Sequence, residues 1–301
     1  MACSCAAAPS QMRWTLLLPA ALRLSVPHTL LSRSTSAKQL STVAMPSVEV
    51  EQFRALNDNY AFLVHDASTG ATMAIDTPEV SPIMDVLNRR GWKLSHVLNT
   101  HHHHDHAGGN LELKRLTGCK IIGPAGEASR IPGIDTPVGG GDSFEVGNLR
   151  FQVIDVGGHT KGHIAFYNEE MKSAFVGDSL FALGCGRLFE GTPEQAWASL
   201  QRLAALPPDT KVYCAHEYTE ANLRFALSVD SANPDLQDRA KVIKQLRSEG
   251  KPTVPTSIEL ELMTNPFMRA SNAELRAQLG VSPEEKDAAV FGKLRKMKDK
   301  F

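Results

Sequence analysis

A run of seven residues, Thr100-His-His-His-His-Asp-His106, constrains this chain more than any other feature of its sequence. Imidazole is a common neutral metal ligand, and a nearby carboxylate adds charge that helps to hold a second divalent ion. Residues 94–100 have the apolar and β-branched content of a buried strand, and residues 107–116 begin a helix. The run therefore lies between a strand and a helix, on a loop of the kind that often carries functional side chains.

The histidines of this run divide by alternation. In an extended segment alternate side chains share a face, so we expect His101 and His103 to converge on one metal ion. Metal-bound imidazoles also need partners for their second nitrogen. We therefore assign His102, His104 and, further along, His163 to positions beside the ligands or at the surface.

Partners for the run follow downstream, at the ends of strand-like segments. His159 comes after such a segment in a glycine-rich stretch and is a candidate third ligand of the first ion. Asp178 ends a short buried strand and is placed to bridge two ions. His216 ends another strand and completes the second ion's ligands with Asp105 and His106. This set predicts a binuclear metallohydrolase.

Two simpler interpretations of the histidine run compete with this one. The run could be a solvated tract that chelates metal by accident, or it could belong to a protein that stores metal or binds partners without catalysis. Neither interpretation explains the third, fourth and bridging ligands that are distributed far downstream. Metal stoichiometry and turnover separate these alternatives.

The ligand pattern resembles that of the metallo-β-lactamase superfamily, and within it the chain is most similar to glyoxalase II, the hydroxyacylglutathione hydrolases. The resemblance extends from Val48 to Phe301. The metal motif is typical of the superfamily, and the later motifs are typical of the family. The matching segments are residues 58–60, 100–110, 177–181, 184–192, 216–219 and 265–269.

The resemblance implies a hydrolase that converts S-D-lactoylglutathione and related 2-hydroxyacyl thioesters to glutathione and D-lactate, the second step of methylglyoxal detoxification. It implies two divalent ions, with zinc favoured and iron or manganese as alternatives. Asp105 and Asp178 are the candidate catalytic carboxylates. The implied ligands are His101, His103 and His159 for one ion, Asp105, His106 and His216 for the other, and Asp178 as the bridge.

The same resemblance implies a site for the glutathione moiety at Arg187, Phe189, Tyr218, Arg295 and Lys298. Two of these positions depart from the family pattern. Arg187 stands where lysine is usual, and a guanidinium can fork onto a carboxylate where lysine acts as a point charge. Phe189 stands where tyrosine is usual and lacks the hydroxyl that could donate to substrate.

Other members of the superfamily share the metal motif, so the motif alone does not decide the reaction. The main alternative is a persulfide dioxygenase, a mononuclear iron enzyme that acts on glutathione persulfide. Such enzymes typically lack a long helical C-terminal region and the Arg-x-x-Lys pattern, which this chain has at Arg295 and Lys298. A lactamase or a nuclease would need other substrate-binding elements.

Composition fits a soluble enzyme that acts on a small molecule. The net charge is −1 and hydrophobic residues make up 42% of the chain, which gives no sign of a nucleic-acid partner. The five cysteines are too scattered for a disulfide framework, which favours a reducing compartment. We expect a monomer with no membrane partner.

The N-terminal segment differs in kind from the rest. Residues 1–47 contain Arg13, Arg23, Arg33 and Lys38 with many Ser, Ala and Leu but no acidic residue, which is typical of an organelle transit peptide. We predict a mitochondrial location, with plastid import or a secretory signal as alternatives. A start at Met45 would produce a cytosolic form.

We predict an α/β fold, an αββα metallo-β-lactamase sandwich followed by a small C-terminal helical domain. Strand-like and helical segments alternate through the first part, whereas the second part has helical patterns at residues 220–228, 234–249, 273–279 and 283–297. The expected units are the transit peptide at 1–47, the catalytic domain at 48–216 and the helical substrate-binding domain at 217–301.

Overall fold

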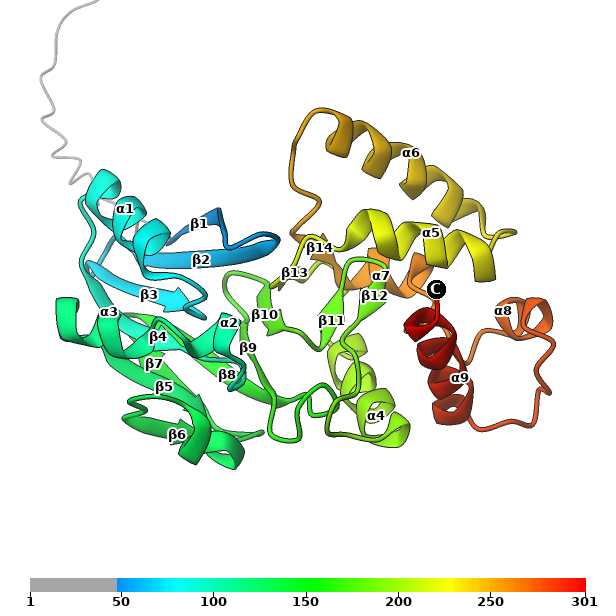
Figure 1. The fold of residues 1–301 in the computed structure, drawn as a ribbon, viewed down its shortest axis with the longest axis horizontal. Coiled ribbons are helices and arrows are strands. Elements are labelled where there is room, and N and C mark those ends of the chain that lie inside the picture. The colour runs from blue at the N-terminus through cyan, green and yellow to red at the C-terminus, as the bar shows by residue number, and fades with distance from the viewer. Residues whose placement is uncertain (1–47) are drawn as a thin grey trace, which may run out of the picture. The chain divides into compact units, whose positions relative to one another are not determined.

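The computed structural model describes residues 48–301, and their framework is a pair of six-stranded sheets (Figure 1). The first sheet has its strands in chain order, antiparallel from β1 to β3 and parallel from β3 to β6. Its strands are β1 (Val48–Ala55), β2 (Asn59–Asp66), β3 (Ala71–Ile75), β4 (Leu94–Leu98), β5 (Lys120–Pro124) and β6 (Thr136–Val138).

The second sheet has the order β14-β13-β10-β9-β8-β7, and only β10 and β13 run parallel in it. Its strands are β7 (Ser143–Val146), β8 (Leu149–Asp155), β9 (Ile164–Asn168), β10 (Ser173–Gly177), β13 (Lys211–Cys214) and β14 (Thr256–Ser257). A separate short hairpin, β11 (Leu180–Phe181) with β12 (Gly184–Cys185), follows β10.

Helices cover the outer faces and make up most of the C-terminal part, which is yellow to red in Figure 1. The N-terminal helices are α1 (Val80–Arg90), α2 (His104–Ala107), α3 (Asn110–Thr117) and the 3₁₀ helix η1 (Ala125–Arg130). The later ones are α4 (Pro193–Ala204), α5 (Thr219–Val229), α6 (Pro234–Ser248), α7 (Ile258–Thr264), α8 (Ala273–Gln278) and α9 (Asp287–Asp299).

Strand β2 shows why this layering forms, because it is apolar on both faces. Phe62 and Val64 lie in the core between the two sheets, whereas Ala61 and Leu63 lie in the core under α1 and α3. Successive side chains of a strand point to opposite faces, so a nearly continuous apolar run needs cover on both sides. The αββα prediction is confirmed.

The expected C-terminal helices are present as α5, α6, α8 and α9. The structure adds α7 and the two-residue strand β14, which the sequence patterns did not indicate because both elements are short. Strand β14 pairs with β13, so a segment after residue 217 completes the second sheet. Residues 48–301 belong to one compact unit, and the predicted transit peptide lies outside the described residues.

The ends of β4, β10 and β13 meet where the two sheets approach each other. Asn59 at the start of β2 forms an isolated bridge with His216 after β13, and the Tyr60 N–H donates to the Ala215 carbonyl at 2.7 Å. A Cβ at Gly177, the last residue of β10, would lie 2.4 Å from Thr100 Oγ1, so the approach requires glycine there. None of the helices in residues 48–301 combines the length and apolar character needed to cross a membrane.

Candidate metal centre

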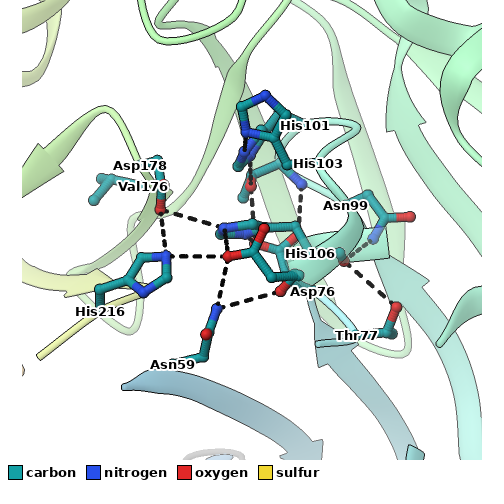
Figure 2. Close-up of polar contacts among 12 residues, drawn as sticks. Asn59, Asp76, Thr77, Asn99, His101, His103, His106, Val176, Asp178 and His216 are labelled. Carbon is teal, nitrogen blue, oxygen red and sulfur yellow. Dashed lines mark hydrogen bonds and ion pairs between the residues drawn. The ribbon is translucent and has the colours of Figure 1, made fainter. Parts of the chain in front are cut away.

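Loops at the carboxyl ends of four strands bring the sequence-predicted ligands together. The run that contains His101 follows β4, and His159 lies in the loop between β8 and β9. Asp178 directly follows β10, and His216 follows β13. Figure 2 shows Asp178 and His216 facing His106 across the site. Both sheets therefore contribute to one cluster of nitrogen and oxygen atoms.

The first group of ligand atoms is formed by three imidazoles. His103 Nδ1 lies 3.0 Å from His101 Nε2 and 3.0 Å from His159 Nε2. The ligand atoms of these residues all lie within 4.8 Å of one another. Burial lowers the pKa of His101, His103 and His159, which favours the neutral imidazole that binds metal.

The second group contains Asp105, His106 and His216, whose ligand atoms also lie within 4.8 Å of one another. Asp105 Oδ2 is 3.6 Å from His106 Nε2 and 3.4 Å from His216 Nε2. Burial alone would lower the pKa of His216, but Asp178 and Asp105 raise it to about 10. These carboxylates favour positive charge at this point, which a divalent ion supplies.

Asp178 lies between the two groups and offers one oxygen to each. Its Oδ1 is 3.3 Å from His106 Nε2 and 3.3 Å from His216 Nε2, whereas its Oδ2 is 3.4 Å from His159 Nε2. Burial alone would raise the pKa of Asp178, but His106 and His216 hold it well below its usual range. The carboxylate is thus ionised and faces both groups.

The second ring nitrogen of each buried histidine is held by an oxygen. Nδ1 of His106 donates to Asp76 Oδ2 at 2.8 Å, and Nδ1 of His216 donates to Asp58 Oδ1 at 2.9 Å. His159 Nδ1 donates to the Arg187 carbonyl at 2.8 Å. Because these oxygens only accept, Nε2 of His106, His216 and His159 carries the free lone pair and points into the centre.

His102, His104 and His163 lie outside the two groups of ligand atoms. His102 points to a buried carboxylate, with Nδ1 2.7 Å from Glu127 Oε2, and His104 is exposed. His163 is fully buried, and its Nε2 accepts the backbone N–H of Asp178 at 3.1 Å. His163 therefore orients Asp178 and is not itself in either group of ligand atoms.

Sequence reasoning missed the carboxylates that orient the histidines. Asp76 accepts from the Thr100 N–H and the Thr100 hydroxyl, both at 2.8 Å, as well as from His106. It follows β3, so it repeats the signal that identified Asp178, an acidic residue just after a buried strand. The Asn59 side-chain amide donates to Asp105 Oδ2 at 3.2 Å. The sequence identifies Asp58 and Asn59 only as part of a family motif.

A cavity of about 550 Å³ opens directly onto this centre. His103, Asp105, Asp178 and His216 form part of its wall. All of the residues assigned to the glutathione moiety also line it, and they are Arg187, Phe189, Tyr218, Arg295 and Lys298.

The donor atoms fit divalent metal ions. Among the described residues, His106 Nε2 and Asp178 Oδ1 are buried without a hydrogen-bond partner, although they lie 3.3 Å apart. Buried polar atoms are rarely left unpaired, so their convergence with the other imidazoles is explained by a shared cation. The αββα fold and this centre define a metal-binding protein of the metallo-β-lactamase class.

Comparisons with known proteins agree with this class and narrow it. Residues 62–216 match the family model of the metallo-β-lactamase superfamily, and residues 217–301 match the hydroxyacylglutathione hydrolase C-terminus. The hydroxyacylglutathione hydrolase of Methylococcus capsulatus is 51% identical over 84% of this chain and 99% of its own length. That of Hyphomonas neptunium is 52% identical over 84% of this chain and 98% of its own length. The chain belongs to the hydroxyacylglutathione hydrolase family.

A solved structure, that of ETHE1 from Myxococcus xanthus, shares the fold at 27% identity. The match has a TM-score of 0.58 and covers 82% of this chain and 98% of that chain. The C-terminal family match and the relatives of about half identity favour the hydrolase over the persulfide dioxygenase alternative.

The prediction of a mitochondrial location is wrong by the same comparisons. The similar hydrolases come from bacteria, which have no mitochondrion or plastid to receive an imported protein. The basic, acid-free composition of residues 1–47 misled the prediction, because composition alone identifies no destination.

Proposed function

We propose that this chain hydrolyses S-D-lactoylglutathione and related 2-hydroxyacyl thioesters to glutathione and D-lactate, with two divalent ions bound. The observation that carries the proposal is the position of Asp178. One of its oxygens faces His106 and His216 and the other faces His159, and the residue lines a cavity of about 550 Å³. A carboxylate shared by two ligand groups is typical of two-metal hydrolytic sites.

The proposed ligands follow from the two groups of donor atoms. We assign the first ion to His101, His103 and His159, the second to Asp105, His106 and His216, and the bridge to Asp178. Nitrogen and oxygen donors of this kind suit zinc, and they also suit iron and manganese. When bound, such a pair of ions lowers the pKa of water from about 15.7 toward about 7 and polarises a carbonyl oxygen.

The chain's own residues prepare this chemistry by fixing donors and charge. The oxygens of Asp58, Asp76 and Arg187 hold the Nδ1–H groups, so the imidazoles need no reorientation during reaction. Water attacks the thioester carbonyl, and the glutathione thiolate leaves without a covalent enzyme intermediate. Cys185 lines the cavity, but burial raises its thiol pKa, which makes it a poor nucleophile.

Cationic side chains at the far side of the cavity suit the carboxylates of glutathione. Burial and the nearby guanidinium groups of Arg295, Arg224 and Arg187 lower the pKa of Lys298, which indicates a gathering of positive charge. An anion placed there relieves this repulsion. We propose that residues 217–301 act as the substrate-binding region and supply Tyr218, Arg295 and Lys298 to the cavity.

Arg295 differs from the other cations in its surroundings. Its side chain is 7% exposed and donates from Nη1 to the Cys185 carbonyl at 2.8 Å, while Nε and Nη2 contact Asp299 Oδ1 at 3.1 and 3.0 Å. Nη1, Nε and Nη2 of Arg295 therefore all contact other groups of the protein. We propose that Arg187 and Lys298 are the freer charges for substrate and that Arg295 also holds β12 against α9.

The test is turnover of S-D-lactoylglutathione by the full chain loaded with zinc, followed by loss of thioester ultraviolet absorbance. We expect kcat/KM in the range of about 10⁴ to 10⁸ M⁻¹s⁻¹ and two ions per chain by elemental analysis. Absence of turnover in protein that carries two ions would overturn the substrate assignment. One ion per chain at full activity would overturn the two-metal assignment.

A further inference from the structure

The carboxylate of Glu190 joins three separate segments of the chain. It accepts Arg130 Nη1 and Nη2 at 2.7 and 3.2 Å, and it accepts the Lys161 N–H at 2.9 Å. Arg130 ends η1, and Lys161 lies in the loop that carries His159. Glu190 itself belongs to segment 186–191, which also carries Arg187 and Phe189 at the cavity.

The backbone of segment 186–191 rests against the His159 loop. The Arg187 carbonyl accepts from His159 Nδ1 at 2.8 Å, and the Gly191 N–H donates to the Gly158 carbonyl at 3.0 Å. A Cβ at Gly191 would lie 2.6 Å from Gly158 Cα, so the two backbones are in direct contact. The side chain of Glu190 extends this contact to η1 through Arg130.

The η1 side of the contact is fixed by Glu127, three residues before Arg130. Its carboxylate is buried and accepts the His102 N–H at 2.9 Å and the Gly162 N–H at 3.0 Å. Because His102 stands between two proposed ligands, η1 is bonded directly to the metal-binding run. Helix η1, which carries Arg130, is therefore held in place relative to the metal-binding run.

The charge on Glu190 persists over the working pH range. The hydrogen bond from Arg130, and to a smaller extent the one from the Lys161 N–H, lowers the pKa of Glu190 to about 2. The Arg130 and Glu190 side chains are 43% and 23% exposed. Exposed ion pairs add little to the free energy of unfolding. We therefore expect this bidentate pair to affect mainly the position of segment 186–191.

We infer that Glu190 and Arg130 are positioning residues that hold segment 186–191, and with it Arg187 and Phe189, in register with the metal centre. The inference rests on the proposed function, which gives these two cavity residues to glutathione binding. The bonds from His159 to the Arg187 carbonyl and from Gly191 to Gly158 do not involve either side chain of the pair. Loss of the pair is therefore expected to leave metal binding and chemistry in place but to weaken substrate binding by Arg187 and Phe189. If the pair had no positioning role, its loss would leave substrate binding unchanged as well.

The first experiment compares kinetics and metal content for Glu190→Gln, Arg130→Gln and the double variant. We expect each single variant to raise KM about threefold to tenfold with kcat within about twofold, as for lost substrate binding. The double variant should be no worse than the worse single one, because both changes break one interaction. Arg130→Lys, which keeps the charge, should recover part of the loss.

A matched control is Glu112→Gln, which breaks the exposed Arg115–Glu112 pair with its contacts of 2.9 and 2.7 Å on α3. KM should stay at the wild-type value in this variant. Unchanged KM in Glu190→Gln, additive effects in the double variant, or loss of metal with a fall in kcat would each overturn the inference.

A second experiment needs no turnover. Arg187 is exposed and is followed by Leu188, so trypsin can cleave after it when the segment is released. We expect faster cleavage at Arg187 in Glu190→Gln than in wild type or Glu112→Gln, identified by the masses of the fragments. Equal rates would contradict the positioning role. If wild-type protein fails to hydrolyse the thioester, the proposed function falls, whereas this cleavage still decides whether the pair anchors the segment.

Discussion

The role of each histidine near the metal centre depends on the contacts of its ring nitrogens. His102 and His103 are adjacent and chemically identical, yet Glu127 takes the Nδ1 of His102 while the Nδ1 of His103 faces His101 and His159. The sequence predicts this difference because alternate residues of an extended segment face opposite ways. It carried no direct sign of Glu127, whose buried carboxylate comes from the 3₁₀ helix η1, further along the chain.

Replacing His103 by alanine is expected to remove a ligand of the proposed first ion. Turnover should fall by at least about 100-fold, since changes even to outer partners of metal ligands typically cost about 10- to 100-fold, and bound metal should fall from two ions toward one. Elemental analysis and the thioester assay measure both effects. His104→Ala is the matched control, because His104 is exposed in the same run. Full activity with both ions in His103→Ala would contradict the assignment.

Replacing Lys298 by glutamine tests the cationic end of the cavity. A charge-assisted hydrogen bond contributes about 1.5–3 kcal/mol, so KM should rise about tenfold or more while kcat changes little. Lys293→Gln is the control on the same helix, since Lys293 is exposed and outside the lining of this cavity. A loss confined to kcat would place Lys298 in the chemical step instead.

At the scale of elements, the strands are the part that sequence patterns identify best. The segments before His101, Asp178 and His216 are short, largely apolar runs, and each forms a strand, β4, β10 and β13. Elements β14 and α7 escaped prediction because short segments acquire their structure from neighbours, β14 through its pairing with β13. Local sequence carries too few residues there to show a period.

Strand β4 offers a test of stability against pH at His96, which is paired directly with Lys120 of β5. Burial, and then the charge of Lys120, lowers the pKa of His96 from 6.5. The unfolded chain therefore binds the proton first as pH falls, and the free energy of unfolding decreases from about pH 6.5 down to the lowered pKa.

His96→Gln should lose less stability than wild type between about pH 7.5 and about pH 5.5, measured by urea unfolding at both values. The comparison between the two proteins removes the contribution of metal-ligand protonation, which they share. An identical loss in both proteins would show that His96 does not contribute to the acid sensitivity.

At the scale of the whole molecule, the cavity depends on segments from the middle and from the C-terminal end of the described chain. Phe181 and Cys185 belong to the hairpin after β10, whereas Lys298 and Arg295 come from the last helix, and Arg295 donates to the Cys185 carbonyl. The buried carboxylate of Glu261 in α7 also accepts the Leu183 N–H at 2.9 Å, which ties the hairpin to the C-terminal helices. Substrate site and fold are therefore coupled.

Removing metal with a chelator is expected to lower the melting temperature, since ions that bind only the folded state stabilise it. Ligand at about 100 times its dissociation constant adds about 2.7 kcal/mol, which corresponds to roughly 5–10 °C for a chain of this size. Calorimetry before and after chelation measures the shift. Zinc should restore it, whereas magnesium, which prefers oxygen ligands, should not. An unchanged melting temperature after complete metal loss would argue against ions bound among the folded ligands.

The sequence by itself determined the family and the layered fold, and it predicted which side chains meet at one centre, because ligand spacing and strand patterns are local features of the chain. The mitochondrial location predicted from residues 1–47 was wrong, because that prediction rested on composition alone. The tertiary structure alone decided which oxygens orient the imidazoles, how Arg295 reaches the Cys185 carbonyl, and how Glu190 meets Arg130. These contacts join residues far apart in the chain, so no local period or spacing encodes them.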